Sequence, residues 1–298
     1  MHTLRYLLAM QVDFEHRSPT ADDTVKIGMV DLEDGDRWIE LAESRAWNWQ
    51  QGCMLQWRPG SDTEILFNDR QGDRFVCRVF DVKSGKNRTL PMPIEHVTAD
   101  GKRAVCSDYR RIQYIRPGYG YAGLPDPNRH VLAPDDVGAW VMDMETGETR
   151  LVVSIAQLVA IPYSNATPKD KHYLNHFEWN PDGTRFLMFD RWVGGVPGQP
   201  TRVFTTADTR PEGKDGQAIH ATRKAHKPSM PSGTATCGYS PSRARRIGFG
   251  VIRSTCCSGA WVATSPTRTT DRASRRKPCG SLPTATSRTS PAPGTSGS

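Results

Sequence analysis

The stretch NHFEWNPDGTRFLMFDR, from Asn175 to Arg191, holds two runs of alternating apolar residues with Pro181-Asp182-Gly183 between them. Proline presets φ at the first turn position, the aspartate side chain caps the turn, and glycine accepts a positive φ. Two apolar runs joined by such a turn predict a β-hairpin.

The same kind of hairpin recurs earlier in the chain. Met54 to Gly60 leads into Glu64 to Asp69, and Ile94 to Val97 leads through Asp100-Gly101 into Arg103 to Cys106. The opening run, Thr3 to Val12, resembles only the second strand of such a pair. We therefore expect the first repeat to lack its opening strand.

A second hairpin class has the form Asp-x-x-x-Gly between two strands. It begins at Asp31, Asp81 and Asp143, which lie 50 and 62 residues apart. One hairpin of each class gives a four-stranded unit, slightly longer than the roughly 40–50 residues of a propeller blade. The surplus falls in the Gly- and Pro-rich loop from Arg116 to Asp136. Helix signals are few, and Ile155 to Ala160 predicts one or two helical turns.

These repeats predict an all-β chain, with an incomplete β-propeller of three to four four-stranded blades in residues 1–210. An irregular β-sandwich is the alternative, although blade-length repetition is not typical of it. An open propeller leaves sheet faces and strand edges uncovered, so we expect this chain to have little activity and to aggregate.

Residues 211–298 differ in character. Residues 212–298 hold 14 Lys and Arg against 3 Asp and Glu, whereas residues 1–211 hold 25 against 29. This low-complexity tail is rich in Ser, Thr, Pro, Ala, Gly and Arg, which is typical of GC-rich DNA translated out of frame. We expect a frameshift after about residue 211; a genuine disordered tail would instead bind nucleic acid through its arginines.

The seven cysteines follow no disulfide or CxxC spacing. We expect Cys53, Cys77 and Cys106 to be buried as small apolar residues. No apolar run is long enough to span a membrane. The sequence as written is typical of a cytoplasmic protein, and a periplasmic location stays open for a full-length parent.

Three segments resemble a bacterial WD40-like propeller family related to oligogalacturonate lyases and the Tol-type propellers: WNWQQGCMLQW (Trp47 to Trp57), RPGYGYAGLPDPN (Arg116 to Asn128) and NHFEWNPDGTRF (Asn175 to Phe186). The resemblance covers roughly residues 3–210. It implies that an acidic oligosaccharide such as oligogalacturonate is recognised at the central channel and cleaved there by β-elimination. A non-catalytic propeller that binds protein partners is the alternative, because one fold hosts many functions.

β-Elimination from a uronate needs a cation that neutralises the carboxylate beside the reacting C–H bond, together with a base. The resemblance implies a divalent metal, such as manganese, held by histidines. His176 is the candidate ligand, and a hydrogen bond to a neighbouring loop is its structural alternative. We expect His172 to lie in a solvent-exposed loop.

Further substrate-binding candidates come from the side chains themselves. Arg116 suits a carboxylate, and Tyr119 and Tyr121 suit a sugar face; alternatively, the tyrosines close their loop over a blade edge. Asn48 and Gln50 alternate with aromatic residues and are candidates for the channel wall.

Arg191 is a candidate substrate-binding residue, and it belongs to an Asp-Arg pair that occurs twice in the chain. Asp69-Arg70 and Asp190-Arg191 occupy matching strand ends, where structural ion pairs are the main expectation and substrate binding the alternative. The sequence contains no phosphate loop, nucleophile elbow or zinc motif.

Overall fold

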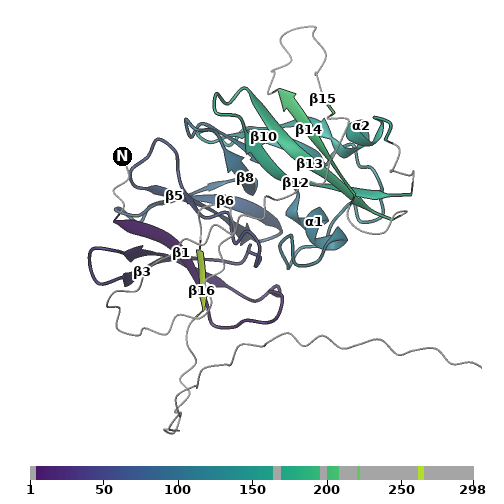
Figure 1. The fold of residues 1–298 in the computed structure, drawn as a ribbon. Helices are drawn as coiled ribbons and strands as arrows, with labels where there is room; N and C mark the ends of the chain where they lie inside the picture. Colours follow the sequence, from purple (N-terminus) through teal and green to yellow (C-terminus); the bar gives the residue numbers. More distant parts are fainter. Residues whose placement is uncertain (1–4, 164–168, 195–199, 208–219, 222–260, 265–298) are drawn as a thin grey trace, which may run out of the picture. The chain divides into compact units, whose positions relative to one another are not determined.

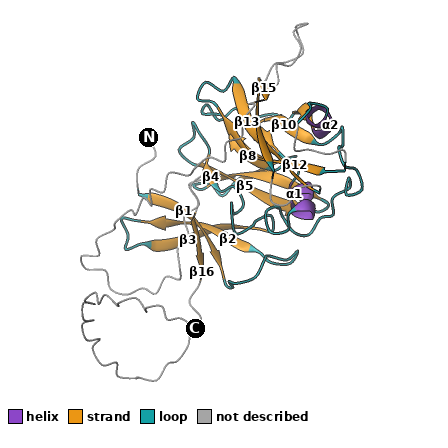
Figure 2. Cartoon of the chain, turned by 45° about the vertical axis from the view of Figure 1, so that its right-hand side comes forward, coloured by secondary structure: helices purple, strands orange, loops and turns teal. Residues whose placement is uncertain are grey.

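The computed structural model describes residues 5–163, 169–194, 200–207, 220–221 and 261–264. Within these ranges the chain forms four sheets of four strands each and two short helices (Figure 1). Figure 2 shows that strands dominate the fold, with only α1 and α2 drawn as helices. The prediction of an all-β propeller built from four-stranded blades is confirmed.

The first sheet has the order β16-β1-β2-β3. Its strands are β1 (Tyr6–Val12), β2 (Val25–Asp31), β3 (Arg37–Ser44) and β16 (Trp261–Thr264). β1 pairs antiparallel with β2 but parallel with β16. The described part of the chain thus has no strand before β1 that forms a hairpin with it.

The other three sheets follow the chain in order. The second sheet contains β4 (Gln56–Trp57), β5 (Glu64–Gln71), β6 (Arg74–Asp81) and β7 (Asn87–Leu90). The third contains β8 (Ile94–Val97), β9 (Arg103–Cys106), β10 (Gly138–Asp143) and β11 (Thr149–Ser154). The fourth contains β12 (Lys171–Trp179), β13 (Arg185–Val193), β14 (Thr201–Ala207) and β15 (His220–Ala221).

Both predicted hairpin classes form. β4–β5, β8–β9 and β12–β13 are the Pro/Asp-Gly hairpins, and β2–β3, β6–β7 and β10–β11 are the Asp-x-x-x-Gly hairpins. In the second class the aspartate caps its own turn: one oxygen of Asp81 accepts from the backbone of Lys83 and Ser84 at 3.0 and 2.7 Å. Gly85 then takes a φ of 71°, where a side chain would be strained.

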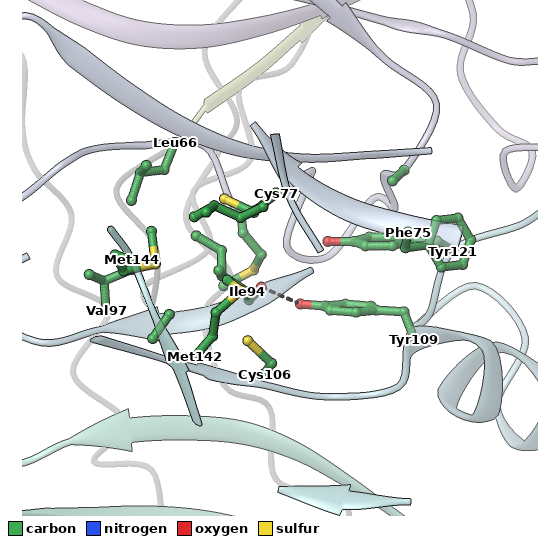
Figure 3. Close-up of a cluster of buried hydrophobic side chains, with 14 of the residues drawn as sticks. Leu66, Phe75, Cys77, Ile94, Val97, Cys106, Tyr109, Tyr121, Met142 and Met144 are labelled. Atoms are coloured by element: carbon green, nitrogen blue, oxygen red, sulfur yellow. Dashed lines mark hydrogen bonds between the residues drawn. The ribbon is translucent and has the colours of Figure 1, made fainter. Parts of the chain in front are cut away.

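The core lies between consecutive sheets, because strand side chains alternate between two faces. On β5, Ile65 and Phe67 pack with the first sheet, whereas Leu66 packs with the third. On β9, Cys106 packs with the second sheet and Val105 with the fourth. The sheets therefore stack face to face, and Figure 3 shows the cluster between the second and third. Cys53, Cys77 and Cys106 are buried and free, as predicted.

Helix α2 (Ile155–Val159) confirms the helix predicted there, and a capping box between Ser154 and Gln157 starts it. Helix α1 (Tyr109–Ile115) was not predicted. Its N-cap is Asp108, whose side chain accepts from the backbone N–H of Arg110 at 2.9 Å. An Asp before an amphipathic turn is a helix-start signal, but at seven residues the helix is too short to show a clear period.

Most of the predicted tail lies outside the described residues, so its frameshift origin stays a prediction. Two short pieces of it are described. β15 pairs with β14 as the fourth strand of the last sheet, and β16 pairs with β1. No helix among the described residues is long and apolar enough to cross a membrane.

Candidate functional site

Helix α1 and the loop after it place Arg116. Arg116 is the C-cap of α1, and its backbone N–H donates to the carbonyl of Ile112 at 2.8 Å. The loop returns against the helix at Gly120, where a Cβ would overlap the backbone of Tyr109 and Gln113. The glycines of this segment thus let the loop pack tightly, and they hold Arg116 and Tyr119 at the helix end.

The two loop tyrosines have different environments. Tyr121 is fully buried and stacks on Tyr109, as Figure 3 shows. The two ring centroids lie 3.9 Å apart. Its hydroxyl accepts from the side-chain amide of Asn68 at 3.0 Å. Tyr121 therefore closes the loop over the second sheet and has no surface for a ligand. Tyr119 is only partly buried, and the guanidinium carbon of Arg116 lies 3.3 Å from its ring centroid.

Asn48 and Gln50 shape the backbone beside this loop. The Asn48 side chain accepts from the backbone of Gln50 and Gln51 at 2.9 and 2.8 Å, and it donates to the carbonyl of Tyr119 at 3.1 Å. Asn48 is 1% exposed, so it holds the loop instead of facing a channel. Gln50 is partly buried, and its side-chain oxygen has no hydrogen-bond partner.

His176 lies at an irregularity in β12, the first strand of the last sheet. The pairing with β13 shifts between Asn175 and Glu178, and His176 takes a φ of 54°. The equivalent residue of the second sheet, Met54, has a φ of 57°, and each lies three residues before a tryptophan. The positive φ thus recurs at matching places in the second and fourth of these repeats, and in the fourth the residue is a histidine. The His176 ring meets the edge of Phe189 at 5.5 Å.

Arg191, on β13, completes the group. Its guanidinium carbon lies 5.3 Å from the Phe189 ring centroid, and its side chain is hydrogen-bonded to Tyr173. Its Nε is buried and has no hydrogen-bond partner among the described residues. Burial lowers the pKa of Arg191, and the nearby charge of Arg116 lowers it further.

Arg116, Tyr119, His176 and Arg191 thus form one group, which we call the Arg116–Arg191 cluster. Burial, followed by the charges of Arg191 and Arg116, lowers the pKa of His176 to about 4. The imidazole is therefore neutral at pH 7, and the two guanidiniums carry the positive charge. No Asp or Glu of the described residues forms an ion pair with either arginine. Such a group favours an anion.

The metal expected at His176 does not fit the residues around it. Among the described residues no three His, Cys, Asp or Glu side chains are placed to hold a metal ion. Two guanidinium charges also act on His176, and they oppose a cation there. We therefore derive no step through a metal.

The expectation for His172 is wrong. His172 lies on β12 and is fully buried, with Nδ1 2.8 Å from Asp190. Arg202 donates to the other Asp190 oxygen at 2.7 Å. At the matching position Asp69 pairs with Arg78 at 2.9 Å. Both aspartates thus form ion pairs, but with arginines of the neighbouring strands, Arg78 and Arg202, and not with Arg70 and Arg191.

Three polar residues on the first strands of the third and fourth sheets were missed. Glu95 and His96 lie on β8, and Glu178 lies on β12. His96 and Glu178 hold equivalent places, each four residues before the aspartate of the following turn, Asp100 or Asp182. Aligning the Pro/Asp-Gly hairpins residue by residue would have shown His96 and Glu178 as polar residues at the same position of two blades.

No model of a known family matches the sequence, and a search of curated proteins gave no match. Solved structures with a similar fold include TolB from Acinetobacter baumannii, at 13% identity and a TM-score of 0.33, covering 64% of this chain and 36% of that chain. An α-L-arabinanase from Penicillium chrysogenum, solved with arabinobiose, gives 9% identity and a TM-score of 0.30, covering 74% and 67%. Both are β-propellers. The chain spans about a third of TolB.

Proposed function

We propose that the Arg116–Arg191 cluster binds the carboxylate of an acidic oligosaccharide such as oligogalacturonate. The observation that carries the proposal is the unbalanced charge: two guanidiniums act on one neutral histidine, and neither has an acidic partner among the described residues. A carboxylate placed between them would receive charge-assisted hydrogen bonds. One of the donors would be Arg191 Nε, which is buried and has no hydrogen-bond partner in the part of the chain that the structure describes.

The aromatic groups of the cluster suit the rest of such a ligand. Tyr119 is partly exposed and already stacks with Arg116, and Phe189 lies against both His176 and Arg191. Aromatic faces pack against the apolar faces of sugar rings, while the polar groups at their edges fix the orientation. The cluster therefore combines a charge site with ring surfaces of the kind that sugar ligands use.

Cleavage by β-elimination is the further step that this site would support. Arg116 and Arg191 would neutralise the carboxylate and so acidify the neighbouring C5–H bond. Neutral His176 would take the C5 proton, the C4–C5 double bond would form, and the C4–O bond would break, with the departing oxygen taking a proton. The His176 pKa of about 4 in the free protein leaves the imidazole unprotonated for this role.

Calorimetric titration of the full chain with digalacturonate tests binding. Arg116→Gln and Arg191→Gln should each weaken binding about 10- to 100-fold, since each removes a charge-assisted contact. Arg45→Gln is the matched control, because Arg45 is exposed and lies outside the cluster. A new ultraviolet absorbance from the unsaturated product would show cleavage in addition to binding.

Unchanged affinity in both cluster variants would contradict the proposal. A protein that binds no acidic sugar but retains a folded propeller would favour the alternative, a platform for protein partners. Binding that depends on the cluster without any new absorbance would leave recognition in place and remove the lyase step.

A further inference from the structure

Asn175, on β12, has a buried side-chain oxygen without a hydrogen-bond partner. The residue is 2% exposed, and its Oδ1 accepts from no group in the described part of the chain. Leaving a buried polar atom unpaired costs free energy, and folded proteins pair the large majority of such atoms. A ligand that brings the missing donor would remove this cost.

The strand register places Asn175 on the same face of the last sheet as Arg191. Asn175 lies directly opposite Phe189 on β13, and Tyr173 lies opposite Arg191; the pairing is regular up to Asn175 and shifts only beyond it. Side chains that lie opposite each other share a face, with their Cβ atoms roughly 5 Å apart. Phe189 also contacts Arg191, whose guanidinium carbon is 5.3 Å from its ring centroid. Asn175 and Arg191 are therefore diagonal neighbours on one face of the sheet.

The irregularity at His176 brings its imidazole to this same face. In an unbroken strand, Asn175 and His176 would point to opposite faces of the sheet. His176 instead takes a φ of 54°, and its ring centroid lies 5.5 Å from that of Phe189, the residue opposite Asn175. An irregularity of this kind re-aims a side chain. Asn175, His176 and Arg191 therefore surround Phe189, and both Asn175 Oδ1 and Arg191 Nε lack partners among the described residues.

We propose that Asn175 is a specificity-determining residue, whose Oδ1 accepts a hydrogen bond from a ring hydroxyl of the uronate that the Arg116–Arg191 cluster binds. An amide oxygen only accepts, so its partner must donate; a sugar hydroxyl donates, whereas a carboxylate, an ether or an ester oxygen does not. This inference rests on the proposed function and narrows its substrate class. The ligand is a uronate whose ring hydroxyl at this position is free, neither acetylated nor methylated.

Calorimetric titration of the full chain with digalacturonate and its deoxy forms, each lacking one ring hydroxyl, tests the site. At least one deoxy form should bind the wild-type protein about 10-fold more weakly than digalacturonate, because it leaves Oδ1 of Asn175 unpaired. Asn175→Leu keeps the size of the side chain and removes the acceptor. In this variant, that deoxy form and digalacturonate should bind with a ratio of affinities close to one. Asn175→Ala should give the same ratio.

Urea unfolding without ligand separates this role from a structural one. Asn175→Leu should leave the free energy of unfolding unchanged or raise it, because it removes an unpaired buried oxygen. Asn68→Leu is the matched control. Asn68 is also fully buried, but its side chain is hydrogen-bonded to the backbone of Ile94 and to the hydroxyl of Tyr121. The Asn68 variant should therefore be clearly less stable than the wild type.

The possible failures are distinguishable. If every deoxy form binds the wild type as tightly as digalacturonate, or if the difference persists in Asn175→Leu, the role of Asn175 is overturned while carboxylate binding stands. A loss of stability in Asn175→Leu as large as that in Asn68→Leu would make Asn175 a structural residue and would also overturn it. If Arg116→Gln and Arg191→Gln both leave the affinity for digalacturonate unchanged, the proposed function falls, and the hydroxyl site falls with it.

Discussion

At the scale of single residues, Glu95 is the most unusual group in the described chain. It is 2% exposed, one of its oxygens has no partner, and the other is hydrogen-bonded to Tyr109. Burial raises the pKa of Glu95 from 4.5 to about 8. A protonated Glu95 can donate to the Tyr109 hydroxyl, which in turn donates to the Ile94 carbonyl at 3.3 Å (Figure 3).

This environment predicts a pH dependence of stability. Between pH 4.5 and about 8 the folded state holds a proton on Glu95 that the unfolded state releases. The free energy of unfolding therefore falls as pH rises through this window. Glu95→Gln keeps the shape of the side chain but removes its titratable proton. At pH 8 the free energy of unfolding of this variant should therefore be higher than that of the wild type by a few kcal/mol. Urea unfolding at pH 5 and pH 8 measures this; a constant difference between the two proteins would contradict it.

The backbone of His176 is strained at the irregularity in β12. A side chain at a φ of 54° costs about 1 kcal/mol, which glycine avoids. His176→Gly should therefore be about 1 kcal/mol more stable than His176→Ala in urea unfolding, although both lose the imidazole. At Lys26, in an ordinary strand, the same pair of substitutions should give the opposite order. If alanine is the more stable at both positions, the bulge geometry is wrong.

At the scale of elements, matching positions in two sheets differ in burial. The side chains of Asp190 and Arg202 are 1% and 3% exposed, whereas those of Asp69 and Arg78 are 15% and 18% exposed. Removing one partner of a buried pair leaves an unpaired charge, at a cost of about 3–5 kcal/mol, while a more exposed pair contributes about 1 kcal/mol or less.

Asp190→Asn should thus destabilise the protein several times more than Asp69→Asn. Urea unfolding of the two variants gives the comparison directly. The substitutions are chemically identical and occupy equivalent strands, so each serves as the control for the other. If both variants lose the same free energy of unfolding, the burial of the His172–Asp190–Arg202 group has no effect on stability.

Some of the observed elements could be predicted from the sequence and others could not. Turn residues such as Asp81 and Gly183 act locally, so all six hairpins could be predicted from them. Helix α1 and the burial of Tyr121 depend on contacts between segments far apart in the chain, such as Tyr121 with Asn68. Likewise, the grouping of Arg116 with Arg191 arises from the packing of a loop against another sheet, and spacing along the chain does not reveal it.

At the scale of the whole molecule, the last sheet has two unequal faces. Along β13, buried residues such as Met188 alternate with half-buried ones such as Leu187 and Phe189. The buried set packs against the third sheet, and no hydrophobic cluster of the described residues covers the other set. Half-exposed apolar residues on a sheet face favour association, in line with the expected aggregation.

The carboxylate site proposed at the Arg116–Arg191 cluster requires that the negative charge of the ligand decides its affinity. The most direct measurement compares trigalacturonate with its fully methyl-esterified form by calorimetric titration of the full chain, at low and at moderate salt. We expect the acid to bind at least about 10-fold more tightly, because esterification removes the charge that the guanidiniums bind. Salt should weaken the binding of the acid more than the binding of the ester. Equal affinities for the two forms would contradict it.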